Sequence, residues 1–83
     1  MTRTPIDDDA QRLRDQRGRR ITQLRKERRW SGRALAREIG LTQSGLWRVE
    51  HGLNGLSDVN LAKIAEVLEV PVTALYEPVE EAS

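Results

Sequence analysis

The stretch from Ser31 to His51 has the sequence SGRALAREIGLTQSGLWRVEH, and it decides the fold. Its first part contains a serine suited to an N-cap, apolar residues at helical spacing, and a glycine where helices often end in a left-handed residue. These features predict a helix over residues 31–39 and a turn at residues 40–41. A second helix is then expected to begin at Gln43, with Thr42 as its N-cap.

This second helix has two different faces. Leu46 and Val49 lie three residues apart, on the side that burial would require. The other side carries an amide, a hydroxyl, an indole, a guanidinium and an imidazole, contributed by Gln43, Ser44, Trp47, Arg48 and His51. Amide and guanidinium groups form paired hydrogen bonds with adenine and guanine edges in the major groove. The sequence therefore predicts a helix-turn-helix that binds DNA through this polar face.

Composition narrows the class of protein. The 83 residues are enough for one small domain. They include no cysteine and one histidine, which excludes disulfides and thiolate metal sites and argues against structural zinc. No apolar run reaches membrane-spanning length, and the N-terminus has no apolar signal-peptide core. We expect a soluble cytoplasmic protein without cofactor or metal, encoded by a bacterium or phage and associated with the nucleoid.

Charge is distributed unevenly along the chain. The net charge is only +1, yet 13 of the 14 lysines and arginines lie at or before Arg48, and seven of the 13 acids lie at or after Glu50. The first half is therefore a candidate surface for a polyanion. The alternative is a solvated basic helix.

The remaining sequence predicts further helices and no strands, so the fold class is all-α. Residues 1–6 are expected to form a flexible arm, residues 7–78 the helix-turn-helix domain, and residues 79–83 a disordered tail. Helices are expected over residues 7–29, from Ser57 or Asp58 to Leu68, and over a last short turn from Val72 to Tyr76. The inward stripe of the first helix is expected to consist of Ala10, Leu13, Ile21 and Leu24. Trp30 is expected to pack into the core.

From residue 5 to residue 78 the chain resembles the N-terminal DNA-binding domains of the lambda-repressor type, the Cro/repressor or Xre family of helix-turn-helix proteins. The residues that carry the resemblance are Gln43-Ser44-Gly45 and the turn Gly52-Leu53-Asn54-Gly55-Leu56. The resemblance implies five helices, with the helix-turn-helix at helices two and three. It also implies a sequence-specific transcriptional regulator, expected to be a repressor. Such a protein binds a palindromic operator in double-stranded DNA as a homodimer, with helix three in the major groove.

Site residues follow from the polar face and from the resemblance together. Base contacts are expected from Gln43, Ser44, Trp47, Arg48 and Asn54. Phosphate contacts are expected from Arg25, Arg33, Arg37, Thr42, His51 and Ser57. Trp47 has two possible partners, the methyl groups of thymine or another protein.

Two departures from the family concern the DNA contacts. Most relatives begin helix two with a glutamine that braces a phosphate and the glutamine of helix three, whereas this chain has Gly32. Arg33 is expected to supply the phosphate contact instead. The N-terminal arm holds only Arg3 before three aspartates, which does not support wrapping around DNA.

Two other classes of function were weighed. An antitoxin of this fold would bind a toxin protein and regulate its own operon. It would use an acidic surface formed by Glu66, Glu69, Glu77, Glu80 and Glu81. Catalysis is not expected, because the sequence shows neither a nucleophile–base pair nor a metal-binding set.

Overall fold

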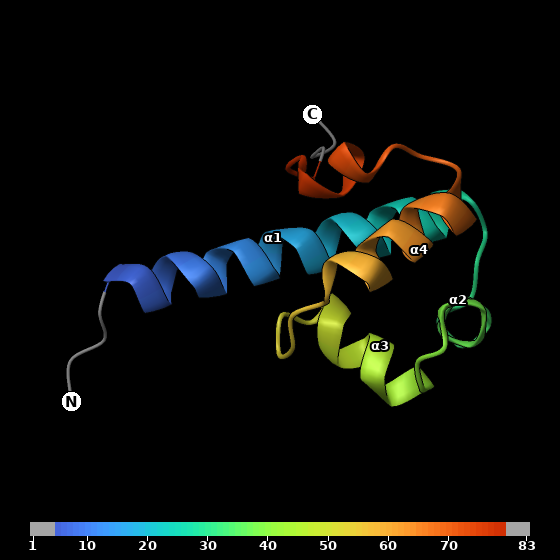
Figure 1. Ribbon diagram of the computed structural model, residues 1–83, viewed down its shortest axis with the longest axis horizontal. Helices are drawn as coiled ribbons and strands as arrows, with labels where there is room; N and C mark the ends of the chain where they lie inside the picture. Colours follow the sequence, from blue (N-terminus) through green and yellow to red (C-terminus); the bar gives the residue numbers. More distant parts are fainter. Residues whose placement is uncertain (1–4, 80–83) are drawn as a thin grey trace.

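The computed structural model describes residues 5–79, and all of its regular structure is helical (Figure 1). The elements are α1 (Pro5–Glu27), α2 (Gly32–Ile39), α3 (Gln43–Glu50), α4 (Asp58–Leu68) and the 3₁₀ helix η1 (Val72–Tyr76). These residues contain no strand, which confirms the all-α prediction. Residues 1–4 of the expected arm and 80–83 of the expected tail lie outside the described residues. The first helix begins at Pro5, earlier than expected.

The expectation of five α-helices is wrong, because the described residues form four and the fifth segment is η1. The backbone N–H of Ala74 donates to Pro71 O at 2.9 Å and that of Glu77 to Ala74 O at 3.4 Å. These bonds span three residues, as in a 3₁₀ helix. The segment has five residues and no side-chain cap, so it is too short to sustain the wider α-helical turn.

Local capping sets the ends of the short helices. The Ser31 hydroxyl accepts a hydrogen bond from the N–H of Ala34 at 3.0 Å, and the Thr42 hydroxyl accepts one from Gly45 at 2.9 Å. Gly40, with φ of 79°, closes α2 in the left-handed region, where glycine has no steric penalty. The predicted extent of α2 and the predicted start of α3 are therefore confirmed. Of the two residues expected to cap α4, Ser57 is the N-cap.

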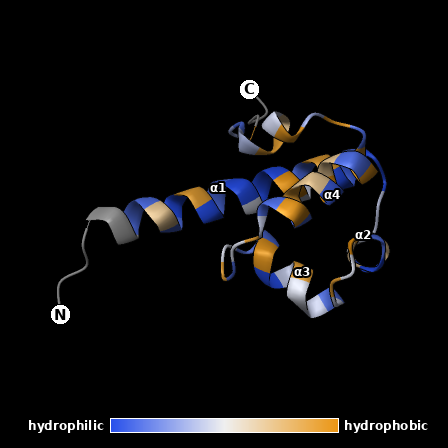
Figure 2. Cartoon of the chain, viewed as in Figure 1, coloured by the Kyte–Doolittle hydropathy of each residue, from blue (hydrophilic) through white to orange (hydrophobic). Residues whose placement is uncertain are grey.

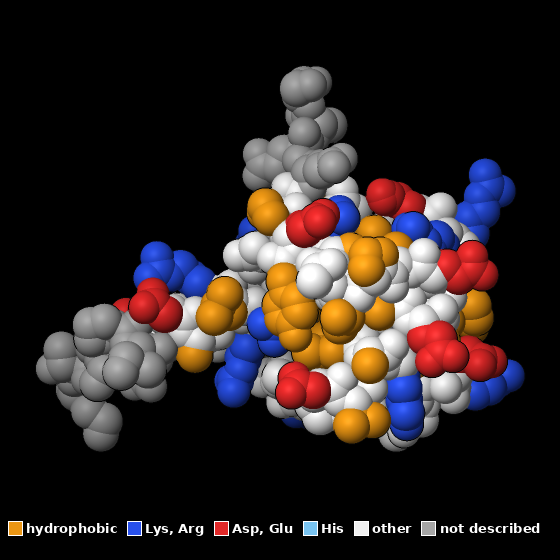
Figure 3. Space-filling model, turned by 45° about the horizontal axis from the view of Figure 1, so that its top comes forward, with side chains coloured by type: hydrophobic (Ala, Val, Ile, Leu, Met, Phe, Trp, Pro, Cys, Tyr) orange, Lys and Arg blue, Asp and Glu red, His pale blue; other side chains and the backbone are white. Residues whose placement is uncertain are grey.

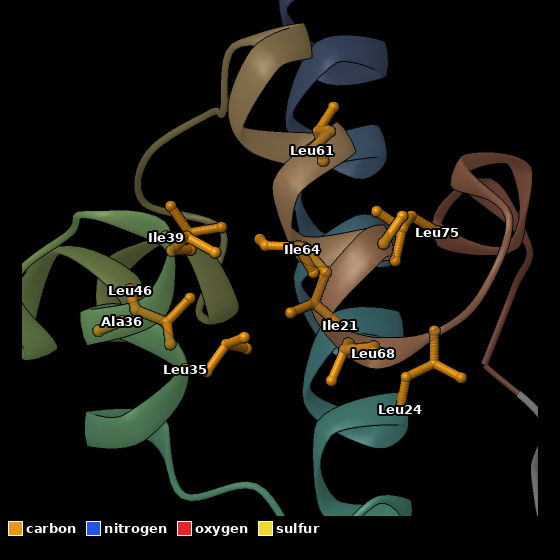
Figure 4. Packing of buried hydrophobic residues seen from close by; sticks show 12 residues of the cluster. Ile21, Leu24, Leu35, Ala36, Ile39, Leu46, Leu61, Ile64, Leu68 and Leu75 are labelled. Atoms are coloured by element: carbon orange, nitrogen blue, oxygen red, sulfur yellow. The ribbon is translucent and has the colours of Figure 1, made fainter.

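The core lies where the second half of α1 meets the other elements (Figure 4). Each element contributes to it: Ile21, Leu24, Leu35, Ala36, Ile39, Leu46, Val49, Leu61, Ile64, Ala65, Leu68 and Leu75. The principal contacts join the elements in a closed ring, from α1 to α3, α2, α4, η1 and back to α1. Trp30 is half-buried and packs against this core, as expected.

The expected inward stripe of α1 is only half correct. Ile21 and Leu24 are buried, but Ala10 is exposed and Leu13 is 54% exposed. The first turns of α1 extend past the other helices, which cover only its second half (Figure 1). Hydropathy follows this arrangement, since α1 is mostly hydrophilic whereas α4 is richer in hydrophobic residues (Figure 2).

Arg20 links α1 to η1 and to Glu77 through a hydrogen bond and an ion pair. It is 8% exposed, and its Nε donates to Ala74 O at 2.9 Å. Its Nη2 lies 3.1 Å from Glu77 Oε2. Hydrogen bonds from a charged donor are stronger than neutral ones. Arg20 is thus a structural member of the basic first half rather than a free surface cation.

Gly18 and an ion pair fix α3 against α1. A Cβ at Gly18 would lie 2.5 Å from Val49 O and 2.6 Å from Glu50 O, so only glycine permits this approach of the two backbones. About two helical turns further along α1, Arg25 forms an ion pair with Glu50. Arg25 Nε lies 2.7 Å from Glu50 Oε2 and Nη2 lies 3.1 Å from Oε1. The two side chains are only 13% and 7% exposed.

Replacing Gly18 with alanine is expected to lower the free energy of unfolding by about 1–3 kcal/mol, because the added methyl group would push the α3 backbone away. Urea unfolding followed by circular dichroism measures this loss. Gly32→Ala is the matched control, since a Cβ there meets nothing closer than Arg25 Cζ at 3.9 Å. An equal loss in both variants would contradict the steric explanation.

Replacing Arg25 with methionine is expected to lower the free energy of unfolding by roughly 3–5 kcal/mol, because a nearly buried Glu50 carboxylate would lose its counter-charge. The same unfolding measurement applies. Adding Glu50→Leu to this variant should recover much of the loss, since no buried charge would remain. A double variant that is no more stable than Arg25→Met would refute the role of the unpaired charge.

Candidate nucleic-acid interface

The exposed face of α3 carries the side chains that the sequence assigns to it. Leu46 and Val49 are buried in the core. Gln43, Ser44, Trp47, Arg48 and His51 are all exposed. The predicted division of the helix into an apolar and a polar face is therefore confirmed. Because α3 is held at its end by Glu50 and on its inner side by two core residues, this polar face has a fixed orientation.

Trp47 and His51 form a stacked pair on α3. Their ring centroids are 4.0 Å apart with an interplanar angle of 23°. His51 Nδ1 also lies 2.8 Å from the backbone carbonyl oxygen of Trp47. The indole remains 53% exposed despite the stacking. Residues four apart on a helix lie one above the other, which brings the two rings together.

A groove of about 660 Å³ runs between α1 and α3 beside this stacked pair. One wall consists of Trp47, Glu50 and His51 from α3, and the other of α1 residues that include Asp15, Arg19, Thr22 and Lys26. Arg19 and Lys26 were not among the contact residues predicted from the sequence. Their separation of seven residues, which puts two cations on one face of a helix, was the available signal.

Arg25 also lines the groove, but most of its guanidinium is already occupied. Besides the two contacts with Glu50, its Nη1 donates to Trp30 O at 2.8 Å. A guanidinium has five N–H donors, so two are left. The phosphate contact expected of Arg25 remains a prediction and would have to be made by those two.

The other expected contact residues lie around α3. Arg33 and Arg37 are exposed on α2, four residues apart and thus on one side of that helix. Asn54 is exposed in the loop that follows α3. The hydroxyls of Thr42 and Ser57 are used as N-caps, and each retains its own O–H donor. All these residues are within the described part of the chain, and their DNA contacts remain predictions.

Other kinds of site find little support in the described residues. Among residues 5–79, no group of three or more histidine, cysteine, aspartate or glutamate side chains is arranged to hold a metal ion. No helix in that part of the chain is both long and apolar enough to cross a membrane.

Similar structures include those of three bacterial proteins. The restriction-modification controller protein C.AhdI from Aeromonas hydrophila superposes with a TM-score of 0.71 and 32% identity, over 75% of this chain and 94% of that one. An HTH_3 family transcriptional regulator from Vibrio cholerae gives 0.73 and 28%, over 81% of this chain and 38% of its own. The hypothetical transcription factor NHTF from Neisseria gives 0.75 and 28%, over 94% and 86%.

Sequence comparison gives the family. No curated protein sequence matches the chain significantly. The profile of the family HTH_3, described as helix-turn-helix, matches residues 21–75. That segment contains α2, α3 and α4 together with the C-terminal part of α1, which carries Arg25 and the core residues Ile21 and Leu24. The chain therefore belongs to the HTH_3 helix-turn-helix family.

Proposed function

We propose that this protein is a transcriptional regulator that binds double-stranded DNA by inserting α3 into the major groove. The observation that carries the proposal is the exposed polar face of α3, opposite the buried Leu46 and Val49. A short helix of this kind, preceded by a second short helix and a tight turn, is the usual major-groove reader of helix-turn-helix proteins. The names of the similar structures, a controller protein and a transcriptional regulator, support the same function.

Base recognition is assigned to α3 and to the loop that follows it. Gln43 lies in the first turn of α3, where its amide can pair with the N6 and N7 atoms of adenine. Arg48, one turn further along, can pair in the same way with guanine. Ser44, Trp47 and Asn54 complete the base-contacting set. The phosphate contacts position this set without selecting sequence, and they come from Arg25, Arg33, Arg37, Thr42, His51 and Ser57.

We further propose that the protein binds a palindromic operator as a homodimer and acts as a repressor. An α3 of eight residues contacts only a few base pairs, so useful selectivity requires two copies. Their half-sites would be about 34–36 Å apart. Large hydrophobic side chains remain exposed and can contribute to such a contact, among them Leu13, Leu53, Val59 and Tyr76. Figure 3 shows hydrophobic side chains gathered in the middle of one face, with acidic and basic groups around them. Such a regulator needs no cofactor and works in the cytoplasm, at the nucleoid.

Selection of bound sequences from a random duplex pool, at two salt concentrations, tests this function directly. An enriched palindrome is expected. Failure to enrich any sequence, together with a stable basic protein partner, would instead support the toxin-binding alternative.

Replacing Gln43 with alanine is expected to weaken binding to the selected operator by about 1–3 kcal/mol, because one bidentate base contact is lost. Binding to a scrambled duplex should change little. Fluorescence anisotropy with labelled duplexes measures both affinities. Thr73→Ala, which removes an exposed hydroxyl from η1, is the matched control. An equal loss on both duplexes would exclude base recognition by Gln43.

A further inference from the structure

The groove between α1 and α3 is lined by basic side chains that take no part in the proposed base contacts. Arg19 and Lys26 on its α1 wall are exposed, and their side chains have no ion-pair or hydrogen-bond partner among residues 5–79. At the rise of an α-helix, seven residues separate them by about 10 Å along α1. They therefore offer two cations to a ligand that extends along the groove.

The acids of the groove cancel these cations only in part. Glu50 is paired with Arg25. Asp15 accepts a hydrogen bond from the neutral Gln11 amide at 3.0 Å and keeps its negative charge. The ionisable groups that line the groove with His51 are Asp15, Arg19, Arg25 and Lys26 from α1 and Glu50 from α3. Three cations thus face two carboxylates, and protonation of His51 would add a further positive charge.

His51 can bind an anion in only one of its protonation states. The carbonyl oxygen of Trp47 can only accept a hydrogen bond, so the Nδ1 that lies 2.8 Å from it must be the donor. In a neutral ring the proton on Nδ1 leaves Nε2 as an acceptor, which repels a phosphate oxygen. Only the imidazolium carries a second N–H, on Nε2. Its charge is compatible with the stacked indole, since aromatic faces attract cations.

We infer that this groove binds the phosphodiester backbone of DNA through Arg19, Lys26 and the protonated form of His51, so that DNA binding takes up a proton. The inference rests on the proposed function and extends it. The groove adjoins the exposed polar face of α3, because Trp47 and His51 belong to both. A backbone strand beside an inserted α3 is therefore its natural occupant. A small aromatic anion, stacked on Trp47, is the rival occupant that the test distinguishes.

Nitrogen NMR of the imidazole tests the proton uptake. His51 is the only histidine in the sequence, so its ring signals are unambiguous. In the free protein, the neutral form of the ring is expected to carry its proton on Nδ1. Adding the selected operator duplex at pH 8 should shift the ring signals toward the imidazolium pattern. A proton on Nε2 in the free protein, or a ring that stays neutral in the saturated complex, would overturn the inference.

Anisotropy binding curves at several salt concentrations, at pH 6 and pH 8, test the groove as a whole. Arg19→Gln and Lys26→Gln should each reduce the slope of log affinity against log salt by about one unit. Lys63→Gln, which removes one exposed cation from α4 outside the groove, is the matched control and should change the slope less. Equal reductions in all three variants would mean that only the total charge matters, and would overturn the assignment to the groove.

The pH dependence of the affinity for DNA tests the role of His51 separately from the other groove residues. The wild-type protein should bind roughly tenfold more tightly at pH 6 than at pH 8, the low end for a hydrogen bond to a charged group. His51→Gln should remove this difference, because its amide donates equally at both values. A pH dependence that His51→Gln retains would overturn the role of His51.

These binding experiments distinguish a failure of the proposed DNA-binding function from a failure of the inference about the groove. If the wild-type protein binds no duplex at either pH, the proposed function fails and this inference fails with it. If the duplex binds but the groove variants behave like Lys63→Gln, only the inference fails. Binding of a fluorescent aromatic phosphate that operator DNA does not displace would assign the groove to the small anion and also overturn it.

Discussion

The ion pair between Arg25 and Glu50 is the constraint on which the rest of the structure depends. Glu50 is the last residue of α3, and the pair joins it to α1 in an environment almost closed to water. Charges in such surroundings are destabilising unless they are paired, so the position of α3 on α1 is specified rather than merely allowed. Gly18 permits the close approach of the two helices that the pair requires. The orientation of the exposed face of α3 and the shape of the groove beside it both depend on this contact between α1 and α3.

Much of the fold was predictable because its signals are local. Ser31, Gly40 and Thr42 set the ends of α2 and α3 through hydrogen bonds or backbone conformation within a few residues. The bounds of α4, from a cap at Ser57 or Asp58 to Leu68, were also predicted. The inward stripe of α1 was predicted too long, because periodicity identifies a face of a helix but does not say whether another element covers it. Leu13 has the right spacing, yet 54% of its surface stays exposed.

The candidate site was likewise predictable only where its signals are local. The polar face of α3 is a property of one helix, so its spacing was sufficient. The partner of Arg25 lies 25 residues away, and no local rule connects the two. Resemblance alone suggested phosphate for this side chain, whereas the structure gives it Glu50. Arg19 and Lys26 became candidates only once α1 and α3 were packed, because a groove between two helices belongs to neither sequence segment alone. The stack of Trp47 on His51, by contrast, is implied by their spacing of four.

The closed ring of contacts has a consequence for how this small domain loses its structure. In a linear stack of helices the terminal elements have one neighbour each and can fray singly. Here α1 and η1 are joined through Arg20, so each element has two principal neighbours, although the first turns of α1 extend past the others. Separating any two neighbours in the ring exposes core side chains of both to water. Unfolding of α3, the helix that would enter DNA, is therefore expected to be coupled to its two neighbours, α1 and α2.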